Sequence, residues 1–430
     1  MAGHVDDGTI RLEAVHRFPN GVVERDGHLR WDLDRLYRET LAGLAKIPTP
    51  VSIGIDTWAV DYGLLDAEGR LLADPIAYRD DRTAAAVIDR VHAAVPPAEL
   101  YAINGLQHLP FNTIYQFAAE PLLDRATQAV LLPDLLAYWL TGALRTEVTN
   151  ASTTGLLDAT TRQWSKPLFD QLGIPLGLLP PIESPGAERG HAPGGSTVIT
   201  VGSHDTASAV VGVPATTDRF AYIASGTWSL VGLELGAPVL TEEARAANFT
   251  NELGVDDRIR FLRNVGGLWL LQECLREWHR GDLDDLLLAA ADLPAGGPTI
   301  DVDDPALIPP GGMPRRIAAR AGRDLDQPAT VRCILDSLGA AYARTVDSAA
   351  RLAGQTVDVI HVVGGGSQNQ LLCQLTADAC GRPVVAGPVE ATAIGNVAVQ
   401  ARAAGVLPAT LEAIRAGIAA TTPLRRYEPT

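Results

Sequence analysis

The stretch Val357–Gly366 reads Val-Asp-Val-Ile-His-Val-Val-Gly-Gly-Gly. Its apolar run is typical of a strand, and the three glycines that follow predict a tight turn. Asn369–Cys380 then has the spacing of a helix, Pro383–Ala386 reads as a second strand, and Glu390–Ala404 reads as a second helix. Because strands and helices alternate here at the spacing of βαβ units, we expect an α/β fold with a mostly parallel sheet.

The rest of the chain also contains apolar segments separated by turn and loop residues. Phe220–Leu235 contains two apolar segments around Ser225-Gly226-Thr227, and Val331–Ala353 has the pattern of a long amphipathic helix. Pro175–Gly195 is rich in proline and glycine, which predicts a loop that crosses between two modules. The chain has 430 residues, enough for two domains of ordinary size.

Composition excludes several classes of function. A net charge of −16 argues against a surface for nucleic acid or an anionic membrane. No apolar stretch reaches the length of a membrane span, and the N-terminus lacks a signal-peptide pattern, so a cytoplasmic location is the expectation. The four cysteines form no C-x-x-C pair, so neither a zinc site nor a disulfide framework is indicated. They are Cys274, Cys333, Cys373 and Cys380.

The stretch Gly202–Ser208 reads Gly-Ser-His-Asp-Thr-Ala-Ser and follows the apolar run Thr197–Val201. Strand ends are where ligands bind in α/β proteins. A carboxylate placed there, that of Asp205, is suited to accept a proton from a substrate hydroxyl. The residues leave a second interpretation open, in which Asp205 and Thr206 cap the helix that follows.

Two glycine-containing turns are candidates for phosphate binding. Glycines at Gly364–Gly366 let backbone N–H groups approach a ligand, and the turn precedes a helix whose N-terminus attracts anions. Ser225-Gly226-Thr227 offers hydroxyl and N–H groups for the same purpose. Each also fits an ordinary turn. A Rossmann fingerprint is not supported, because Ser367, Gln368 and Asn369 follow the three glycines. A Walker A loop is absent, because neither of the only lysines, Lys46 and Lys166, follows a glycine.

Further polar residues are candidates for ligand contacts. Asn264 and Gln272 lie on either side of Gly266-Gly267 and either bind a polar ligand or decorate a helix. The polar segment Gly105–Gln116 either lines a pocket or is a solvated loop. A carboxylate at a strand end, two glycine turns and no P-loop fit phosphoryl transfer, which needs positioning, charge neutralisation and a base. A sugar-binding protein without catalysis is the alternative.

Nine ordered segments make the chain similar to the FGGY carbohydrate kinases over nearly its whole length. They are His16–Gly21, Ser52–Trp58, Ala77–Asp80, Leu109–Thr113, Ser203–Ala209, Ser225–Leu230, Gly267–Gln272, Val363–Gly366 and Ala386–Ala391.

The resemblance implies two actin-like (ribonuclease H-like) ATPase domains with the active site in the cleft between them. Residues 1–212 would form the sugar-binding domain and residues 213–430 the ATP-binding domain. The implied activity is ATP-dependent phosphorylation of L-rhamnulose at its 1-hydroxyl in L-rhamnose degradation, by a monomer or small homo-oligomer. Other ketoses, such as xylulose or fuculose, and a sugar-binding form without kinase activity remain alternatives.

The resemblance also assigns roles to single residues. Asp205 matches the proton acceptor, and Ala59 stands where the family usually has a glycine that contacts the sugar through its backbone. No protein metal ligand is assigned; Mg²⁺ would bridge the phosphates of ATP. The other sugar contacts are His204, Asp205, Thr206 and Asn264, and the ATP contacts are Thr227, Gln272 and Gly365.

The start of the chain departs from the family pattern. Members open with a strand and an Asp-x-Gly-x-x-Ser-x-Arg turn that cradles phosphate, whereas Met1–Val5 aligns just after that turn. A sheet without that strand leaves backbone groups unpaired on its neighbours. We expect either that Met1 is an internal methionine of a longer chain or that this form is a sugar-binding remnant, and that the polypeptide as written phosphorylates poorly.

Overall fold

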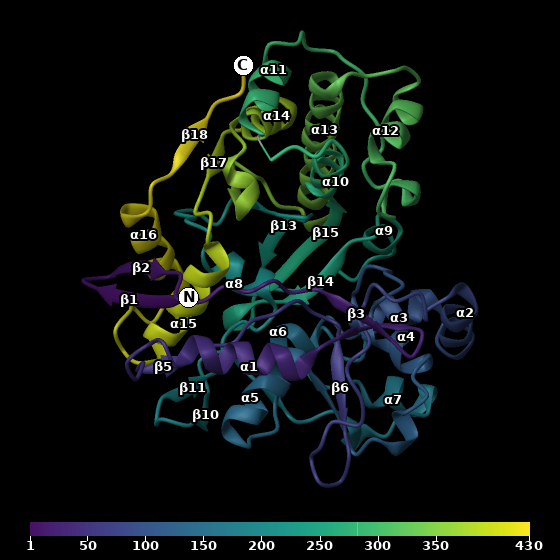
Figure 1. Cartoon of the computed structure of the whole chain (residues 1–430), viewed down its shortest axis with the longest axis vertical. Helices are drawn as coiled ribbons and strands as arrows, with labels where there is room; N and C mark the ends of the chain where they lie inside the picture. Colours follow the sequence, from purple (N-terminus) through teal and green to yellow (C-terminus); the bar gives the residue numbers. More distant parts are fainter. Residues whose placement is uncertain (282) are drawn as a thin grey trace. The chain divides into compact units, whose positions relative to one another are not determined.

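The computed structural model describes residues 1–281 and 283–430 and divides into two compact units (Figure 1). The first unit comprises Met1–Gly212, Leu235–Phe261 and Thr392–Gly417. The second comprises Val213–Glu234, Leu262–Ala391 and Ile418–Thr430. Each unit is therefore assembled from separate stretches of the chain, while the division at residue 212 into two family domains stays a prediction.

The second unit is built on the sheet that Val357–Gly366 predicts. Within this unit the strands follow the order β15-β13-β12-β16-β17-β18. The pairs β12–β16 and β16–β17 are parallel, as predicted, but β12–β13 and β17–β18 are antiparallel, so the expectation of a mostly parallel sheet is wrong at these two places. A short turn between β12 and β13 forces an antiparallel return. The strands of this unit are β12 (Phe220–Ser225), β13 (Trp228–Leu235), β15 (Ile259–Gly266), β16 (Val359–Val363), β17 (Val384–Ala386) and β18 (Arg425–Tyr427), whereas β14 (Thr250–Leu253) belongs to the first unit.

The long helix α13 (Gln327–Ala353) packs against α14 (Gln370–Cys380), and Figure 1 shows the two helices side by side. Asp326 caps α13 by accepting from the Ala329 N–H, and Gly354 ends it in the left-handed conformation. The close approach favours a glycine, because a Cβ at Gly339 would lie 3.1 Å from the Leu375 carbonyl oxygen, a tight contact. The other helices of this unit are α10 (Trp269–Glu277), α11 (Asp284–Ala291) and α12 (Met313–Ala321).

Small sheets, rather than one large sheet, form the first unit. A three-stranded sheet has the order β10-β11-β5, in which β11 and β5 are parallel, and the pairs β1–β2, β3–β4, β6–β7 and β8–β9 stand apart. Because β9 and β10 lie inside the unit, the prediction that Pro175–Gly195 crosses between modules is wrong. The strands are β1 (Ala2–Asp6), β2 (Thr9–Glu13), β3 (Val22–Arg25), β4 (His28–Trp31), β5 (Ser52–Ile53), β6 (Tyr62–Leu65), β7 (Gln128–Leu131), β8 (Thr146–Glu147), β9 (Ile182–Glu183), β10 (Glu188–His191) and β11 (Thr197–Ile199).

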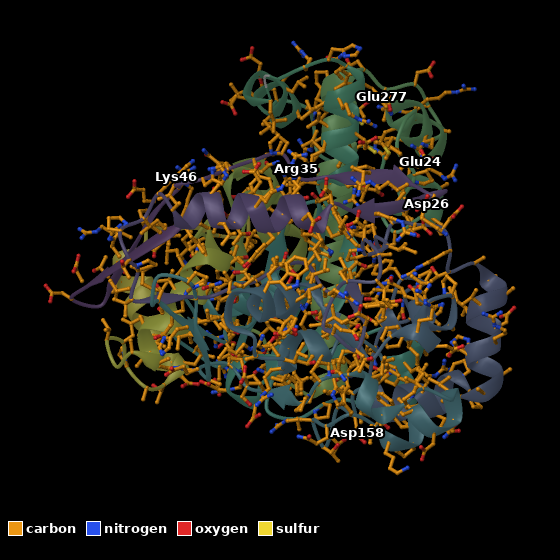
Figure 2. The ribbon with its side chains drawn as sticks, turned by 60° about the horizontal axis from the view of Figure 1, so that its bottom comes forward. Glu24, Asp26, Arg35, Lys46, Asp158 and Glu277 are labelled. Carbon is orange, nitrogen blue, oxygen red and sulfur yellow. The ribbon has the colours of Figure 1, made fainter. Side chains whose placement is uncertain are left out.

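Helices enclose these sheets. The leucines between Leu33 and Leu44 recur at helical spacing and form α1 (Leu33–Leu44), which Asp32 caps by accepting from the Arg35 N–H. Its polar face carries Arg35, which Figure 2 labels together with Lys46 just beyond the helix end. The other helices are α2 (Ala85–Ala94), α3 (Pro97–Asn104), α4 (Thr113–Ala118), α5 (Leu132–Thr141), α6 (Val148–Ala151), α7 (Lys166–Leu172), α8 (Asp205–Val211), α9 (Glu242–Ala246), α15 (Ala391–Ala403) and α16 (Leu411–Thr421). Within the described ranges, no helix combines the length and the apolar character needed to cross a membrane.

The antiparallel pair β6–β7 divides the core of the first unit. Tyr62 and Leu64 belong to one apolar cluster, while Leu65 belongs to another. On the partner strand, Leu131 joins the first cluster and Val130 the second. Because successive side chains of a strand point to opposite faces, this strand pair is buried on both sides.

Candidate active site

The strand end at Gly202–Ser208 is held in the first unit by a short backbone bridge. The Thr57 N–H donates to the Ser203 carbonyl at 2.9 Å, and the Asp205 N–H donates to the Thr57 carbonyl at 2.9 Å. Asp205 is the first residue of α8 and His204 its N-cap. The structure thus brings the segment that contains Ala59 beside the segment that contains the predicted base.

The two oxygens of Asp205 have different surroundings. Oδ1 accepts from the Thr206 N–H at 2.6 Å and from the Thr206 hydroxyl at 3.2 Å. Oδ2 accepts no hydrogen bond from the described residues, and the side chain is 49% exposed. The interpretation that Asp205 and Thr206 cap the helix is wrong, because the N-cap is His204 and it makes no side-chain cap hydrogen bond. Oδ1 instead accepts one N–H of the first helical turn, and Oδ2 stays open to a substrate.

His204 lies in a buried charged group that the sequence did not reveal. Its Nδ1 is 3.2 Å from Glu252 Oε2 and 3.1 Å from Arg260 Nη2. Burial by itself raises the pKa of Glu252, but the nearby Arg260 and His204 outweigh it and leave that pKa below its ordinary value. Glu252 and Arg260 lie about 50 residues further along the chain, so only the tertiary structure brings them to His204.

The backbone around Ala59 is strained. The Asp61 N–H donates to the Ala59 carbonyl at 2.9 Å, and Val60 between them has a φ of +68°. A hydrogen bond across one residue with positive φ marks a γ-turn of the rare kind, which is costly for a β-branched residue. The Val60 carbonyl accepts from the Thr113 hydroxyl at 2.8 Å and from Gln116 Nε2 at 3.2 Å. Strain of this kind persists where the surroundings fix it, and it clusters at functional sites.

Asp61 anchors this turn. Its buried Oδ2 accepts from the indole N–H of Trp31 at 2.6 Å and of Trp58 at 2.9 Å, while Oδ1 accepts from Gln116 at 3.3 Å. Burial raises the pKa of Asp61 to about 6, and these hydrogen bonds oppose the rise. The carboxylate therefore fixes the residues on both sides of Ala59.

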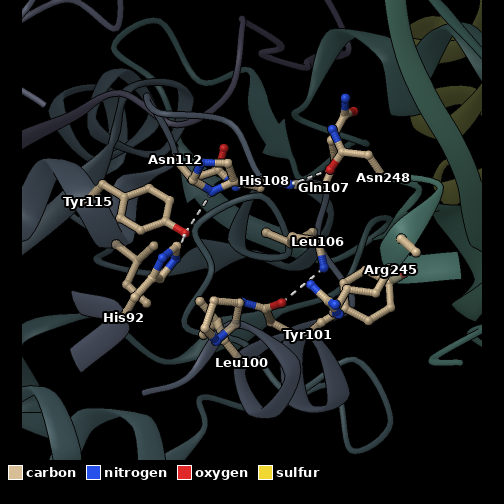
Figure 3. A pocket seen from close by; sticks show the side chains of 14 residues that line it. His92, Leu100, Tyr101, Leu106, Gln107, His108, Asn112, Tyr115, Arg245 and Asn248 are labelled. Atoms are coloured by element: carbon tan, nitrogen blue, oxygen red, sulfur yellow. Dashed lines mark hydrogen bonds between the residues drawn. The ribbon is translucent and has the colours of Figure 1, made fainter. Parts of the chain in front are cut away.

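The polar segment Gly105–Gln116 does line a pocket, as one of its two interpretations predicts. The cavity measures about 390 Å³ and lies within the first unit. Figure 3 shows the Tyr115 hydroxyl between His92 and His108, with distances of 2.9 Å and 3.1 Å to their ring nitrogens. Burial lowers the pKa of both histidines. None of the predicted sugar or ATP contacts lines this cavity.

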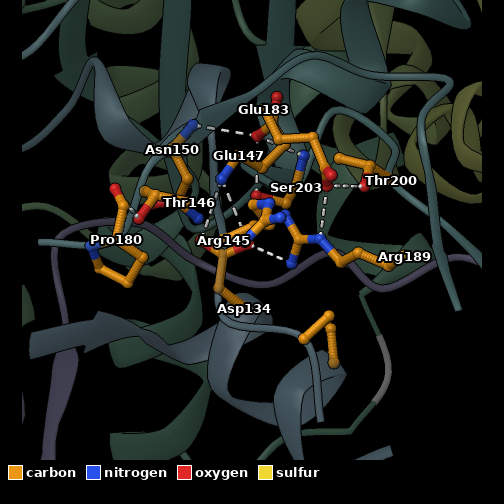
Figure 4. Close-up of polar contacts among 12 residues, drawn as sticks. Asp134, Arg145, Thr146, Glu147, Asn150, Pro180, Glu183, Arg189, Thr200 and Ser203 are labelled. Carbon is orange, nitrogen blue, oxygen red and sulfur yellow. Dashed lines mark hydrogen bonds and ion pairs between the residues drawn. The ribbon is translucent and has the colours of Figure 1, made fainter. Parts of the chain in front are cut away.

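Glu147 holds the strand end from behind. Its buried carboxylate accepts from the Ser203 N–H at 3.0 Å and the Ser203 hydroxyl at 2.8 Å (Figure 4). It also accepts from the Thr149 N–H at 2.8 Å, the Thr149 hydroxyl at 2.6 Å and the Asn150 N–H at 3.1 Å. Burial raises the pKa of Glu147, and these hydrogen bonds oppose the rise. Sequence reasoning missed this residue, whose only signal was the Thr/Asn/Ser-rich stretch that follows it.

The buried side chain of Arg189 forms ion pairs beside Glu147. Arg189 donates to Asp134 at 2.6 Å and to Glu183 at 2.6 Å, and Figure 4 shows it beside both carboxylates. Asp134 in turn accepts from the Glu147 N–H at 3.2 Å. The strand end that presents Asp205 therefore rests on a chain of buried polar contacts.

In the second unit, the turn between β12 and β13 collects the predicted ATP contacts. Thr227 lies in this turn, and its hydroxyl is 3.4 Å from Gln272 Oε1. The Leu268 N–H donates to the Gly226 carbonyl at 3.0 Å. A Cβ at Gly267 would lie 2.5 Å from the Thr227 carbonyl oxygen, so this close approach requires glycine.

The triple glycine packs on the same turn. A Cβ at Gly366 would lie 2.0 Å from the Ser225 hydroxyl oxygen, whereas a Cβ at Gly365 would meet open space. The helix predicted over Asn369–Cys380 is present as α14, which Asn369 caps, and a 3₁₀ turn (Gly365–Gln368) leads into it. The exposed backbone of Gly365 is thus available to a ligand, while its neighbours are packed.

Asn264 lies on β15 in the second unit, apart along the chain from the other predicted sugar contacts. Within the described ranges, no three His, Cys, Asp or Glu side chains gather in a way that would hold a metal ion.

Comparison with protein-family models decides the family. The model of the N-terminal domain of the FGGY family of carbohydrate kinases matches residues 13–212, and the model of the C-terminal domain matches residues 221–404. The chain belongs to the FGGY family of carbohydrate kinases.

Curated relatives and solved structures agree with this assignment. The chain is 44% identical to the rhamnulokinase of Klebsiella pneumoniae (strain 342) over 410 residues, 91% of this chain and 84% of that protein. It is 42% identical to the rhamnulokinase of Enterococcus faecalis, over 98% of this chain and 90% of that protein.

Among solved structures, the ligand-bound xylulose kinase of Lactobacillus acidophilus superposes with a TM-score of 0.79 at 17% identity, over 99% of this chain and 90% of that chain. The Plasmodium falciparum glycerol kinase with ADP gives 0.77 at 18% identity, with the same coverage of both chains. At this identity the likeness concerns the fold alone, and the predicted fold class, α/β with two actin-like domains, is confirmed.

Proposed function

We propose that this FGGY kinase transfers the γ-phosphoryl group of ATP to the 1-hydroxyl of L-rhamnulose. The observation that carries the proposal is the half-exposed carboxylate of Asp205, whose Oδ1 accepts from Thr206 while its Oδ2 is open. The curated rhamnulokinases at 42–44% identity support the choice of sugar.

For this reaction the protein mainly has to supply a base and a site that positions ATP and the sugar. As the sugar oxygen bonds to the γ-phosphorus, its O–H bond breaks and the proton passes to Oδ2 of Asp205. The bond between the γ-phosphorus and the β–γ bridging oxygen breaks, and its electron pair leaves with ADP. Ala59, His204, Thr206 and Asn264 would orient the sugar.

Thr227, Gln272 and Gly365 would bind ATP. The fit rests on the open space beside Gly365, where a nucleotide can approach the backbone without meeting a Cβ. A Mg²⁺ ion that keeps several waters and binds chiefly to phosphate oxygens suits a chain without a clustered metal site among its described residues. When bound, it would neutralise phosphate charge.

A sugar panel tests the proposal directly. ADP release is measured with L-rhamnulose, xylulose and fuculose, and the product is identified by phosphorus NMR. Release with L-rhamnulose and a 1-phosphate product is expected. Faster release with another ketose would replace the sugar assignment, and sugar binding without ADP release from any of them would contradict the kinase.

A further inference from the structure

Two buried charged residues, Arg260 and Glu252, stand behind the predicted base. Arg260 Nη2 lies 3.1 Å from His204 Nδ1 and 3.0 Å from Glu252 Oε2, and that oxygen lies 3.2 Å from His204 Nδ1. The Arg260 side chain is fully buried, and those of His204 and Glu252 are each 9% exposed. His204 Nε2, on the other side of the ring, is 3.5 Å from Asp205 Oδ1.

The triangle around Nδ1 limits where the imidazole of His204 carries its proton. A guanidinium group only donates, so a contact with Arg260 favours a bare Nδ1 and hence a proton on Nε2. Glu252 Oε2 makes no hydrogen bond in the part of the chain that the structure describes, so it is the negative charge of Glu252, 3.2 Å away, that favours a proton on Nδ1. With a proton on Nδ1 alone, the lone pair of Nε2 would face the carboxylate of Asp205, which is unfavourable. Two states of the ring remain favourable: the neutral ring with a bare Nδ1, and the ring with a proton on each nitrogen. In both of them Nε2 carries a proton.

We propose that Arg260 and Glu252 are positioning residues, which fix His204 with the Nε2–H directed at Oδ1 of Asp205. With Oδ1 occupied by this N–H and by Thr206, Oδ2 is the oxygen left to take the proton of the sugar hydroxyl. The distance of 3.5 Å is long for a hydrogen bond, but catalytic contacts of this kind shorten when substrate binds. The catalytic half of this proposal rests on the proposed role of Asp205.

The burial of Arg260 supports a positioning role. Its Nε donates to the Leu253 carbonyl at 3.1 Å, but Nη1 has no hydrogen-bond partner in the part of the chain that the structure describes. A buried ion pair stabilises a fold weakly or not at all, because both charges lose their hydration. An unsatisfied buried donor adds a further cost. Stability alone therefore does not account for a guanidinium group at this place.

Histidine ring NMR tests the orientation independently of activity. The nitrogen shifts of ¹⁵N-labelled histidines report which nitrogen carries the proton, and the loss of one set of signals in His204→Gln assigns the ring. The first variant is Arg260→Lys, which keeps the positive charge but can contact only one of the two partners, His204 or Glu252. The second is Glu252→Gln, which removes the negative charge and keeps nearly the same side-chain volume. Arg332→Lys is the matched control, because Arg332 is also buried and bonds a carboxylate and backbone carbonyls.

In the unchanged chain, Nε2 of His204 should carry a proton. Both test variants should change the ring signals of His204 and lower kcat about tenfold, with the sugar Kd within about twofold, whereas Arg332→Lys should change neither. A bare Nε2 in the unchanged chain, or ring signals unaltered in both variants, would overturn the proposed positioning. Altered signals with normal kcat would overturn its catalytic part. A chain that phosphorylates no sugar would instead refute the proposed function, and the ring signals would still decide the orientation.

Discussion

The carboxylate of Glu147 accepts two hydrogen bonds from Ser203, one from its N–H at 3.0 Å and one from its hydroxyl at 2.8 Å. Ser203 lies two residues before Asp205, so this buried carboxylate holds in place the strand end that carries the proposed base. The same oxygen also accepts from Thr149 and Asn150, which leaves it acting only as an acceptor.

Replacing Glu147 with glutamine should destabilise the chain by about 2–4 kcal/mol. The amide NH₂ group would face N–H and O–H donors of Ser203, Thr149 and Asn150 and would leave several of these buried donors without an acceptor. Chemical denaturation measures the change. Glu68→Gln, at an exposed turn, is the control and should stay within about 0.5 kcal/mol of the unchanged chain. Equal stability of the two variants would mean that Glu147 does not support the strand end.

Asp205→Asn should lower kcat roughly 10²–10⁴-fold while sugar affinity changes little, since an amide keeps the Thr206 contact but accepts no proton. Steady-state kinetics and calorimetry with L-rhamnulose separate the two effects. Asp158→Asn is a matched control, because Asp158 Oδ1 also accepts backbone N–H groups, from Thr160 and Thr161. Near-normal turnover of Asp205→Asn would remove Asp205 from the base role.

Asp56 should make stability fall as pH rises. Burial is the main reason that its pKa is raised to about 7. A hydrogen bond from Asn396 lowers this pKa, and the negative charge of Asp205 raises it further. The folded pKa lies above the unfolded one, so the contribution is complete below pH 3.8 and is lost as pH rises through about 7.

From pH 5 to pH 7, the unchanged chain should therefore lose about 2 kcal/mol more stability than Asp56→Asn. Denaturant titrations at the two pH values give this difference. Asp170→Asn, an exposed carboxylate paired with Lys166, should follow the unchanged chain. Parallel pH dependence of the unchanged chain and Asp56→Asn would contradict the raised pKa.

How much of this was predictable depends on whether local pattern or tertiary contact decides each feature. The α1 and α13 helices, the strand Val359–Val363 and the cap at Asp32 follow from spacing and caps within a few residues. The role of Pro175–Gly195 was predicted wrongly, because its prolines and glycines shape turns inside a unit as well as between units.

The predicted site has the same limits. Asp205 at a strand end is readable from its neighbours in sequence, whereas its supports are not. Glu147 lies 56 residues before Ser203, and Arg260 lies 56 residues after His204. A single sequence carries no signal that joins such distant positions. The strained turn at Val60 is equally invisible, since valine seldom adopts a positive φ.

The triple glycine offers a contrast between adjacent positions. Gly366→Ala should destabilise the second unit by about 1–3 kcal/mol or more, because its Cβ would overlap the Ser225 hydroxyl. Gly365→Ala should leave stability within about 0.5 kcal/mol, since its Cβ meets open space. If ATP lies against Gly365, the same methyl group should weaken ATP binding about tenfold, or about 1.4 kcal/mol. Calorimetry with ATP and thermal denaturation distinguish the two effects. An unchanged ATP affinity in a stable Gly365→Ala chain would exclude this backbone contact, whereas weaker binding without loss of stability follows only if the nucleotide occupies that space.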